Sequence, residues 1–114
     1  MKTLTITSMK IQPDIYRLIK QGVKTHEVRD EPFHPDIIVY RSTADETVLG
    51  VWRADPDSMR LLGRDRDDET IRLAAINRNL FYRLFPNQPT LYAVTLGRET
   101  SWRRVEQELG AGGE

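Results

Sequence analysis

The side chains with the clearest chemical potential lie between residues 22 and 29, in the segment GVKTHEVR. Lys24, Glu27 and Arg29 place two cations and one carboxylate within six residues, directly after a glycine that ends a predicted helix. A turn that leads into a strand is a firm platform for such side chains, because the sheet fixes the backbone beneath them. The alternative interpretation is an exposed strand edge, where alternating charges prevent pairing with another sheet.

These three residue types suit the recognition of a nucleobase and its phosphate. A charged Lys24 together with Arg29 would bind a phosphate or a carbonyl oxygen. Glu27 would accept a hydrogen bond from an exocyclic amine, as carboxylates do with cytosine. To act as a general base instead, Lys24 needs a pKa lowered from about 10.4 towards about 7 to 8. Burial or a neighbouring cation would lower this pKa, whereas a close Glu27 would raise it.

The spacing of the cluster leaves two arrangements open. Val23 and Val28 are an odd number of residues apart, so one regular strand cannot bury both on the same face. In a regular strand, Lys24 would lie on the opposite face from Glu27, which would then lie beside Arg29. If the first residues instead belong to the turn after the helix, all three side chains can converge.

The elements that must position this cluster follow from the hydrophobic pattern. Alternation over residues 3–9 predicts a half-buried strand. Apolar residues at helical spacing predict a helix over 12–21, which Gly22 ends. The segment 31–35 contains two prolines and is predicted to be a loop.

Further strands follow in the second part of the chain. Residues 37–40 are almost uniformly apolar, which favours burial on both faces, and residues 48–52 are predicted to pair with them as a hairpin. Residues 63–68 are predicted to form an exposed charged loop. The last clear strand is expected at residues 90–96. Together with the helices, this order predicts an α+β fold: a small open β-barrel or curved mixed sheet with helices packed at its ends.

Three helices are predicted after the hairpin. Asp67 or Asp68 is expected to cap the first, and Asn79 the second, which Pro86 would end. A third, terminal helix would pack one apolar face onto the body of the protein, and this face would contain Trp102, Val105 and Leu109.

Length and composition limit the possible classes of protein. The chain has 114 residues, enough for one domain, which we assign to residues 1–109, followed by a frayed tail at 110–114. Lys plus Arg and Asp plus Glu are both 17, so the net charge is zero, which excludes a histone-like polycation but permits a small basic pocket. Cysteine is absent, which excludes disulfides and thiolate chemistry. We predict no metal site and no cofactor.

The sequence also indicates where in the cell the protein is expected. It has no run approaching the roughly 18 apolar residues of a membrane span. Its first ten residues place Thr and Ser among the apolar positions, unlike the core of a signal peptide. We therefore expect a cytoplasmic protein that has no membrane partner.

The charged cluster resembles a family signature. Gly22, Lys24, Glu27 and Arg29 match G-x-K-x-x-E-x-R, the motif of ASCH domains, which belong to a PUA-like superfamily. The order of predicted elements over about residues 3 to 98 is similar as well. The resemblance implies a PUA-like β-barrel with a cleft beside the motif, and RNA or a nucleotide as the partner.

The same resemblance raises an enzymatic alternative. Some bacterial members resemble ribonucleases or metal-independent hydrolases of modified nucleosides such as N4-acetylcytidine. The hydrolase lineage resembles G-x-K-T-x-T-x-R, with a catalytic lysine, a threonine and a distant glutamate. Lys24 matches the lysine, but Glu27 stands at the threonine position, and Asp65 is the only carboxylate near the place expected for the distant acid. Binding and catalysis, the latter with Lys24 and Glu27 as catalytic residues, both remain open at this point.

Other residues near the cluster have a functional and a structural interpretation. Thr25 offers a hydroxyl to a ligand, and Phe33 could stack a base or anchor its loop. Tyr40 and Trp52 could also stack a base, although aromatic residues in apolar strands more often belong to the core. A third hypothesis is a protein-interaction adaptor that uses the helix of Trp102.

Overall fold

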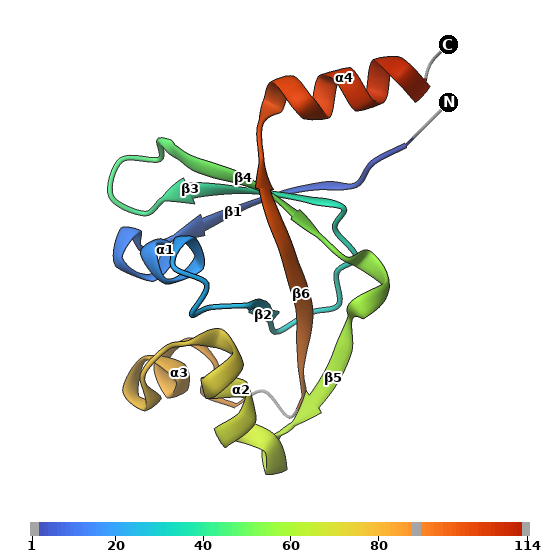
Figure 1. Cartoon of the computed structure of the whole chain (residues 1–114). Helices are drawn as coiled ribbons and strands as arrows, with labels where there is room; N and C mark the ends of the chain where they lie inside the picture. Colours follow the sequence, from blue (N-terminus) through green and yellow to red (C-terminus); the bar gives the residue numbers. More distant parts are fainter. Residues whose placement is uncertain (1–2, 88–89, 113–114) are drawn as a thin grey trace.

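The computed structural model describes residues 3–87 and 90–112, which form six strands and four α-helices (Figure 1). The strands are β1 (Ile6–Ile11), β2 (His26–Arg29), β3 (Ile37–Ser42), β4 (Val48–Ala54), β5 (Arg60–Gly63) and β6 (Thr90–Thr100). The helices are α1 (Pro13–Lys20), α2 (Asp67–Ala74), α3 (Arg78–Leu84) and α4 (Trp102–Gly112). Short 3-10 turns occur at Pro56–Ser58 and Arg64–Arg66.

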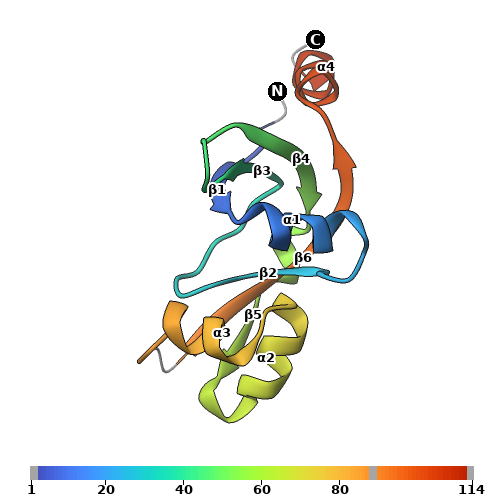
Figure 2. The same ribbon diagram turned by 90° about the vertical axis from the view of Figure 1, so that its left-hand side faces the viewer.

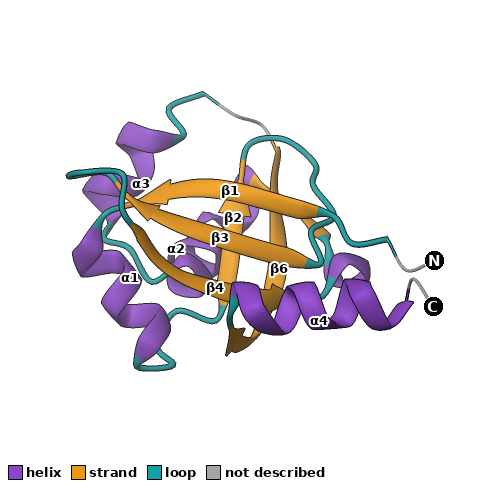
Figure 3. Cartoon of the chain, turned by 90° about the horizontal axis from the view of Figure 1, so that it is seen from above, coloured by secondary structure: helices purple, strands orange, loops and turns teal. Residues whose placement is uncertain are grey.

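The strands form one curled, half-barrel sheet (Figures 1 and 3). Its order is β1-β3-β4-β6-β2, and β5 pairs with β6 beside this path. Strands β1 and β3 are parallel, whereas the other pairs are antiparallel. The long strand β6 pairs with β4 near its C-terminal end and with β2 and β5 near its N-terminal end. Strands β1 and β2 are therefore the two ends of the path.

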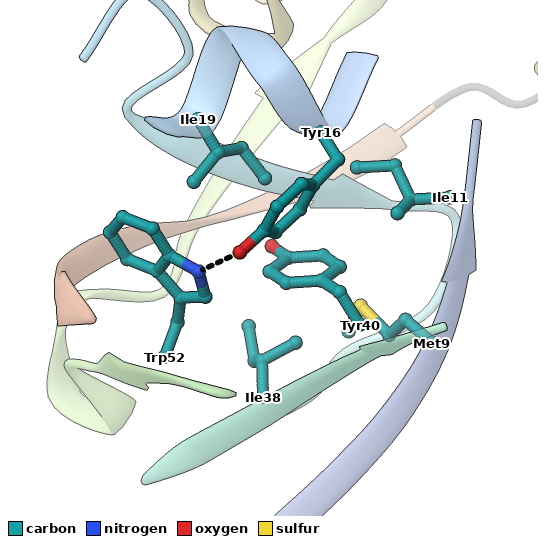
Figure 4. Close-up of a cluster of buried hydrophobic side chains, with 7 residues drawn as sticks. All are labelled: Met9, Ile11, Tyr16, Ile19, Ile38, Tyr40 and Trp52. Carbon is teal, nitrogen blue, oxygen red and sulfur yellow. Dashed lines mark hydrogen bonds between the residues drawn. The ribbon is translucent and has the colours of Figure 1, made fainter. Parts of the chain in front are cut away.

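Three clusters of buried side chains hold the helices onto this sheet. One cluster packs α1 against β1, β3 and β4 (Figure 4); it consists of Met9, Ile11, Tyr16, Ile19, Ile38, Tyr40 and Trp52. A second packs α2 and α3 over β2, β5 and β6, and a third packs Val105 of α4 against β3 and β4. Because β3 contributes alternate residues to the first and third clusters, it is buried on both faces, as its apolar sequence predicts.

The predicted α+β class is confirmed, and so is the hairpin, since β3 and β4 pair antiparallel. The predicted charged loop at 63–68 is wrong in part. Gly63 ends β5, a 3-10 turn follows, and α2 begins at Asp67. The last strand is also longer than predicted: it continues past residue 96 to Thr100, where Glu99 and Thr100 pair with β4.

The predicted helix caps need correction. The N-cap position of α2 is Arg66, so Asp67 and Asp68 lie inside the first turn, where their charge complements the helix dipole. Asn77, not Asn79, caps α3, because its side-chain oxygen accepts a hydrogen bond of 2.8 Å from the backbone N–H of Leu80.

The terminal helix differs from its prediction in two ways. Val105 is fully buried as expected, but Trp102 is 42% exposed, so the predicted apolar face does not pack as a whole. The helix also continues to Gly112, through part of the expected tail, and residues 113–114 lie outside the described residues. Within the described residues, no helix is both long and apolar enough to cross a membrane.

Candidate functional site

The turn after α1 fixes the start of the charged motif. Gly22 has a φ of 76°, a left-handed conformation that glycine adopts without steric cost. Its N–H donates to the carbonyl of Ile19 at 3.1 Å, and that of Val23 donates to Leu18 at 2.9 Å, which is the Schellman pattern. The N–H of Lys24 also donates to Leu18, at 3.0 Å. Strand β2 begins only at His26, so the turn alternative is the correct one.

Lys24 is a buried lysine with a defined partner. Its residue is 5% exposed, and its Nζ donates to the carbonyl oxygen of Ala74 at 3.0 Å. Ala74 is the last residue of α2, where helix carbonyls carry partial negative charge and favour a cation. Burial lowers the pKa of Lys24, and the nearby Glu27 carboxylate opposes this effect. The Lys24 side chain therefore has a lowered pKa and is held in a fixed position.

Glu27 is oriented by a buried tyrosine. The hydroxyl of Tyr40 donates to Glu27 Oε1 at 2.8 Å, while the ring of Tyr40 is fully buried in the first core cluster (Figure 4). Burial, followed by the Glu27 charge, raises the pKa of Tyr40 well above its usual value. The tyrosine therefore remains protonated and acts as a hydrogen-bond donor to the carboxylate.

The partners of Arg29 among the described residues are weak. Its guanidinium lies 3.8 Å from a Glu31 oxygen and 6.0 Å from the centroid of the Phe33 ring. Phe33 is half-buried and packs against the first core cluster. In this structure its ring contacts the core and supports Arg29, which fits the anchoring interpretation better than base stacking.

Two adjoining hollows meet at Glu27. The inner hollow has a volume of about 190 Å³, contains Lys24 in its wall and is otherwise lined mainly by apolar residues of β1, α1 and α3. The outer hollow has a volume of about 350 Å³ and contains Arg29 in its wall. The residues common to both are Lys10, Glu27, Val28, Leu84 and Phe85. We refer to the two hollows together as the cleft.

The cleft lies at the open side of the half-barrel, where residues of the end strands β1 and β2 both line it. Figure 2 shows β2 between α1 on one side and the α2–α3 pair on the other. The cleft thus separates the first core cluster from the second, and residues of both clusters line it.

Lys10 is a cleft residue that the sequence analysis missed. It lines both hollows and forms an ion pair of 2.8 Å with Glu46, in which both side chains are more than 60% exposed. In the sequence, Lys10 stands at the end of an alternating strand and cannot be told apart from an ordinary exposed lysine. Only the convergence of β1 and β2 at the cleft gives it importance.

Three other residues considered in the sequence analysis do not line the cleft. Thr25 is exposed, and its hydroxyl is 2.8 Å from Nδ1 of the neighbouring His26. Asp65 lies exposed in a 3-10 turn. Neither lines the inner or the outer hollow. Trp52 belongs to the core, where its indole N–H donates to the Tyr16 hydroxyl at 3.1 Å (Figure 4).

Comparison with known proteins bears on the fold. No family model matches the sequence, and no curated protein matches it. The crystal structure of ASCH from Zymomonas mobilis is similar, with a TM-score of 0.67 and 16% identity over 90% of this chain and 78% of that one. Two mutant forms of the same protein give TM-scores of 0.67 and 0.68 at 16% and 15% identity, covering 90% and 94% of this chain and 80% and 81% of theirs. The half-barrel that the resemblance implies is confirmed, because the chain has the same fold as these ASCH structures.

Proposed function

We propose that this protein binds RNA or a nucleotide in the cleft, with Lys24, Glu27 and Arg29 as the main contacts. One observation carries the proposal: Glu27 lies where the two hollows meet, Lys24 lines the inner one and Arg29 lines the outer one. The likeness to ASCH structures supports it through the fold.

The two hollows suit different parts of a nucleotide. Complete small-molecule sites usually enclose about 300 to 1,000 Å³, so the inner hollow of about 190 Å³ accommodates a fragment such as one base. Its apolar walls would contact the faces of the ring. Glu27 would accept a hydrogen bond from an exocyclic amine of the base, and Lys24 would donate one to an acceptor atom of the base.

The outer hollow would take the phosphate and sugar. Arg29 and Lys10 line it, and their carboxylate partners Glu31 and Glu46 are exposed. Surface ion pairs of this kind contribute at most about 1 kcal/mol. A phosphate can therefore replace either carboxylate at small cost and gain charge-assisted hydrogen bonds, bidentate ones from Arg29.

The test is fluorescence anisotropy with short, labelled, single-stranded oligoribonucleotides of each base. The variants are Lys24→Met, which keeps the apolar stem, and Arg29→Ala. The matched control is Arg17→Ala, because Arg17 is an exposed arginine of α1 whose pair with Asp14 spans 3.5 Å.

We expect each cleft variant to weaken binding about tenfold or more, since a hydrogen bond to a charged group contributes about 1.5 to 3 kcal/mol. Arg29→Ala should also reduce the salt dependence of log K by about 0.7, the contribution of one phosphate in single strands. Binding that is the same in both cleft variants and in the control would overturn the proposal.

A second candidate function is metal-independent hydrolysis of a modified nucleoside or of RNA. The observation that favours it is Lys24 itself, a buried amine in the wall of an apolar hollow, whose pKa burial lowers. A neutral lysine can act as a general base. This function predicts turnover in the presence of a chelator and its loss in Lys24→Met. Incubation with a panel of acylated nucleosides and RNAs tests it, and the absence of any product would remove this candidate.

A further inference from the structure

The main chain of β2 has a free edge that faces away from β6. The N–H of Leu96 in β6 donates to the carbonyl of Thr25 at 2.9 Å, which sets the alternation of the antiparallel ladder. Glu27 and Arg29 therefore exchange hydrogen bonds with β6, whereas the main-chain groups of Val28 point to the other side. Within the described residues, β2 pairs with no strand on that side.

Strand β1 has an equivalent free edge. The N–H of Ile37 donates to the carbonyl of Thr5 at 3.1 Å, and that of Thr43 donates to Ile11 at 3.0 Å. In the parallel ladder with β3, the odd-numbered residues of β1 therefore bond to β3, and the N–H and C=O of Lys10 point away from it.

Residues of both edges line the cleft. Lys10 and Val28 line both hollows, one from each end strand of the sheet. Val28 is 6% exposed as a residue, and the ladder with β6 leaves its N–H and C=O unpaired on that strand. A buried main-chain group without a partner costs free energy. Whatever occupies the cleft is therefore the available source of the missing hydrogen bonds.

We propose that the main-chain N–H and C=O groups of Val28 and Lys10 hydrogen-bond to the edge of the bound base. This inference rests on the proposed function and extends it, because it adds main-chain contacts to those of Lys24 and Glu27. A nucleobase presents donors and acceptors side by side on each edge, which matches an N–H and a C=O on one residue. A peptide strand fits less well, since it needs a run of alternate residues. Of the residues whose main chain faces a free edge, Lys10 on β1 and Val28 on β2 line both hollows.

Amide hydrogen exchange, followed by NMR on the wild-type chain, tests this inference without any substitution. In the free protein, we expect the amides of Lys10 and Val28 to exchange faster than those of Ile11, Glu27 and Arg29, which bond within the ladders. The probe is the oligoribonucleotide that binds most tightly in the anisotropy panel. At 100 times its Kd, exchange at Lys10 and Val28 should slow by up to about 100-fold, because only about 1% of the protein is then free.

The possible results separate the two proposals. If the probe binds and Lys24→Met weakens it, but neither amide gains protection, the main-chain contacts are wrong and the site stands. Slow exchange at Val28 in the free protein, equal to that at Glu27, would also overturn the inference, because the group would already be paired. If no oligoribonucleotide binds, the proposed function fails and the inference fails with it.

Discussion

Replacing Tyr40 with phenylalanine isolates the hydrogen bond that orients Glu27. The substitution keeps the fully buried ring and its contact with Tyr16, whose ring centroid is 5.9 Å away, so it creates no large cavity. It removes only the hydroxyl that donates to Glu27 Oε1 at 2.8 Å. Because the carboxylate is half-buried and lines the cleft, water can reach part of it in the variant.

The expected cost follows from this geometry. A hydrogen bond to a charged group contributes about 1.5 to 3 kcal/mol, and partial access of water reduces the loss to about 1 to 2 kcal/mol. For a domain of this size, each kcal/mol lowers the Tm by roughly 4 °C. Tyr40→Phe should therefore lower the Tm by roughly 4 to 8 °C. It should also weaken oligoribonucleotide binding, since Glu27 loses its fixed orientation.

Urea denaturation of Tyr40→Phe, Glu27→Ala and the double variant measures the coupling between the two side chains. The matched control is Tyr82→Phe, because the Tyr82 hydroxyl donates to Asp67 Oδ2 at 3.1 Å on the surface. We expect a coupling of about 1 kcal/mol in the cycle and a change within about 0.5 kcal/mol for the control. A coupling near zero, or a loss no greater than that of the control, would refute the reasoning.

Two further substitutions test Lys24 in the cleft and the packing of α1 on the sheet. Because the pKa of Lys24 is lowered, the unfolded chain binds more protons than the folded one between that lowered pKa and 10.5, and wild-type stability rises with pH across this window. Lys24→Met should therefore gain most over the wild type at neutral pH and lose that advantage as the pH approaches 10.5, measured by urea denaturation; a pH-independent difference would contradict this. Gly50→Ala would place its Cβ 2.9 Å from Cζ of Tyr16 and still closer to the hydroxyl, so it should destabilise the fold by about 1 to 3 kcal/mol. An unchanged melting curve would show that α1 yields without cost.

Local patterns in the sequence predict much of the fold. The Gly22 stop, the hairpin and the doubly buried strand β3 each depend on neighbouring residues, and each is confirmed. The full extent of β6 could not be predicted in this way, because residues 97–100 have no apolar side chains, and Glu99 and Thr100 are held in the sheet by pairing with β4. The cap of α3 shows the same limit, since Asn77 and Asn79 are both good capping residues and the chain path decides between them.

Only the part of the candidate site that lies within one short segment could be predicted from the sequence. Lys24, Glu27 and Arg29 lie within one motif, so their types and order are visible in the sequence. The partners that give them their properties come from far along the chain: Ala74 accepts from Lys24 across 50 residues, and Tyr40 donates to Glu27 from another strand. No periodicity connects such positions, because only the curling of the sheet brings them together.

The long strand β6 has a consequence for how the protein is made. Ribosomal synthesis releases β1 to β4 before β6, and of these β1, β3 and β4 can pair with one another early. Among the described strands, β2 and β5 pair only with β6, whose residues come near the end. Strand β2 therefore has no strand partner until β6 is available, and the wall of the cleft that carries Lys24, Glu27 and Arg29 is completed only when these two strands pair.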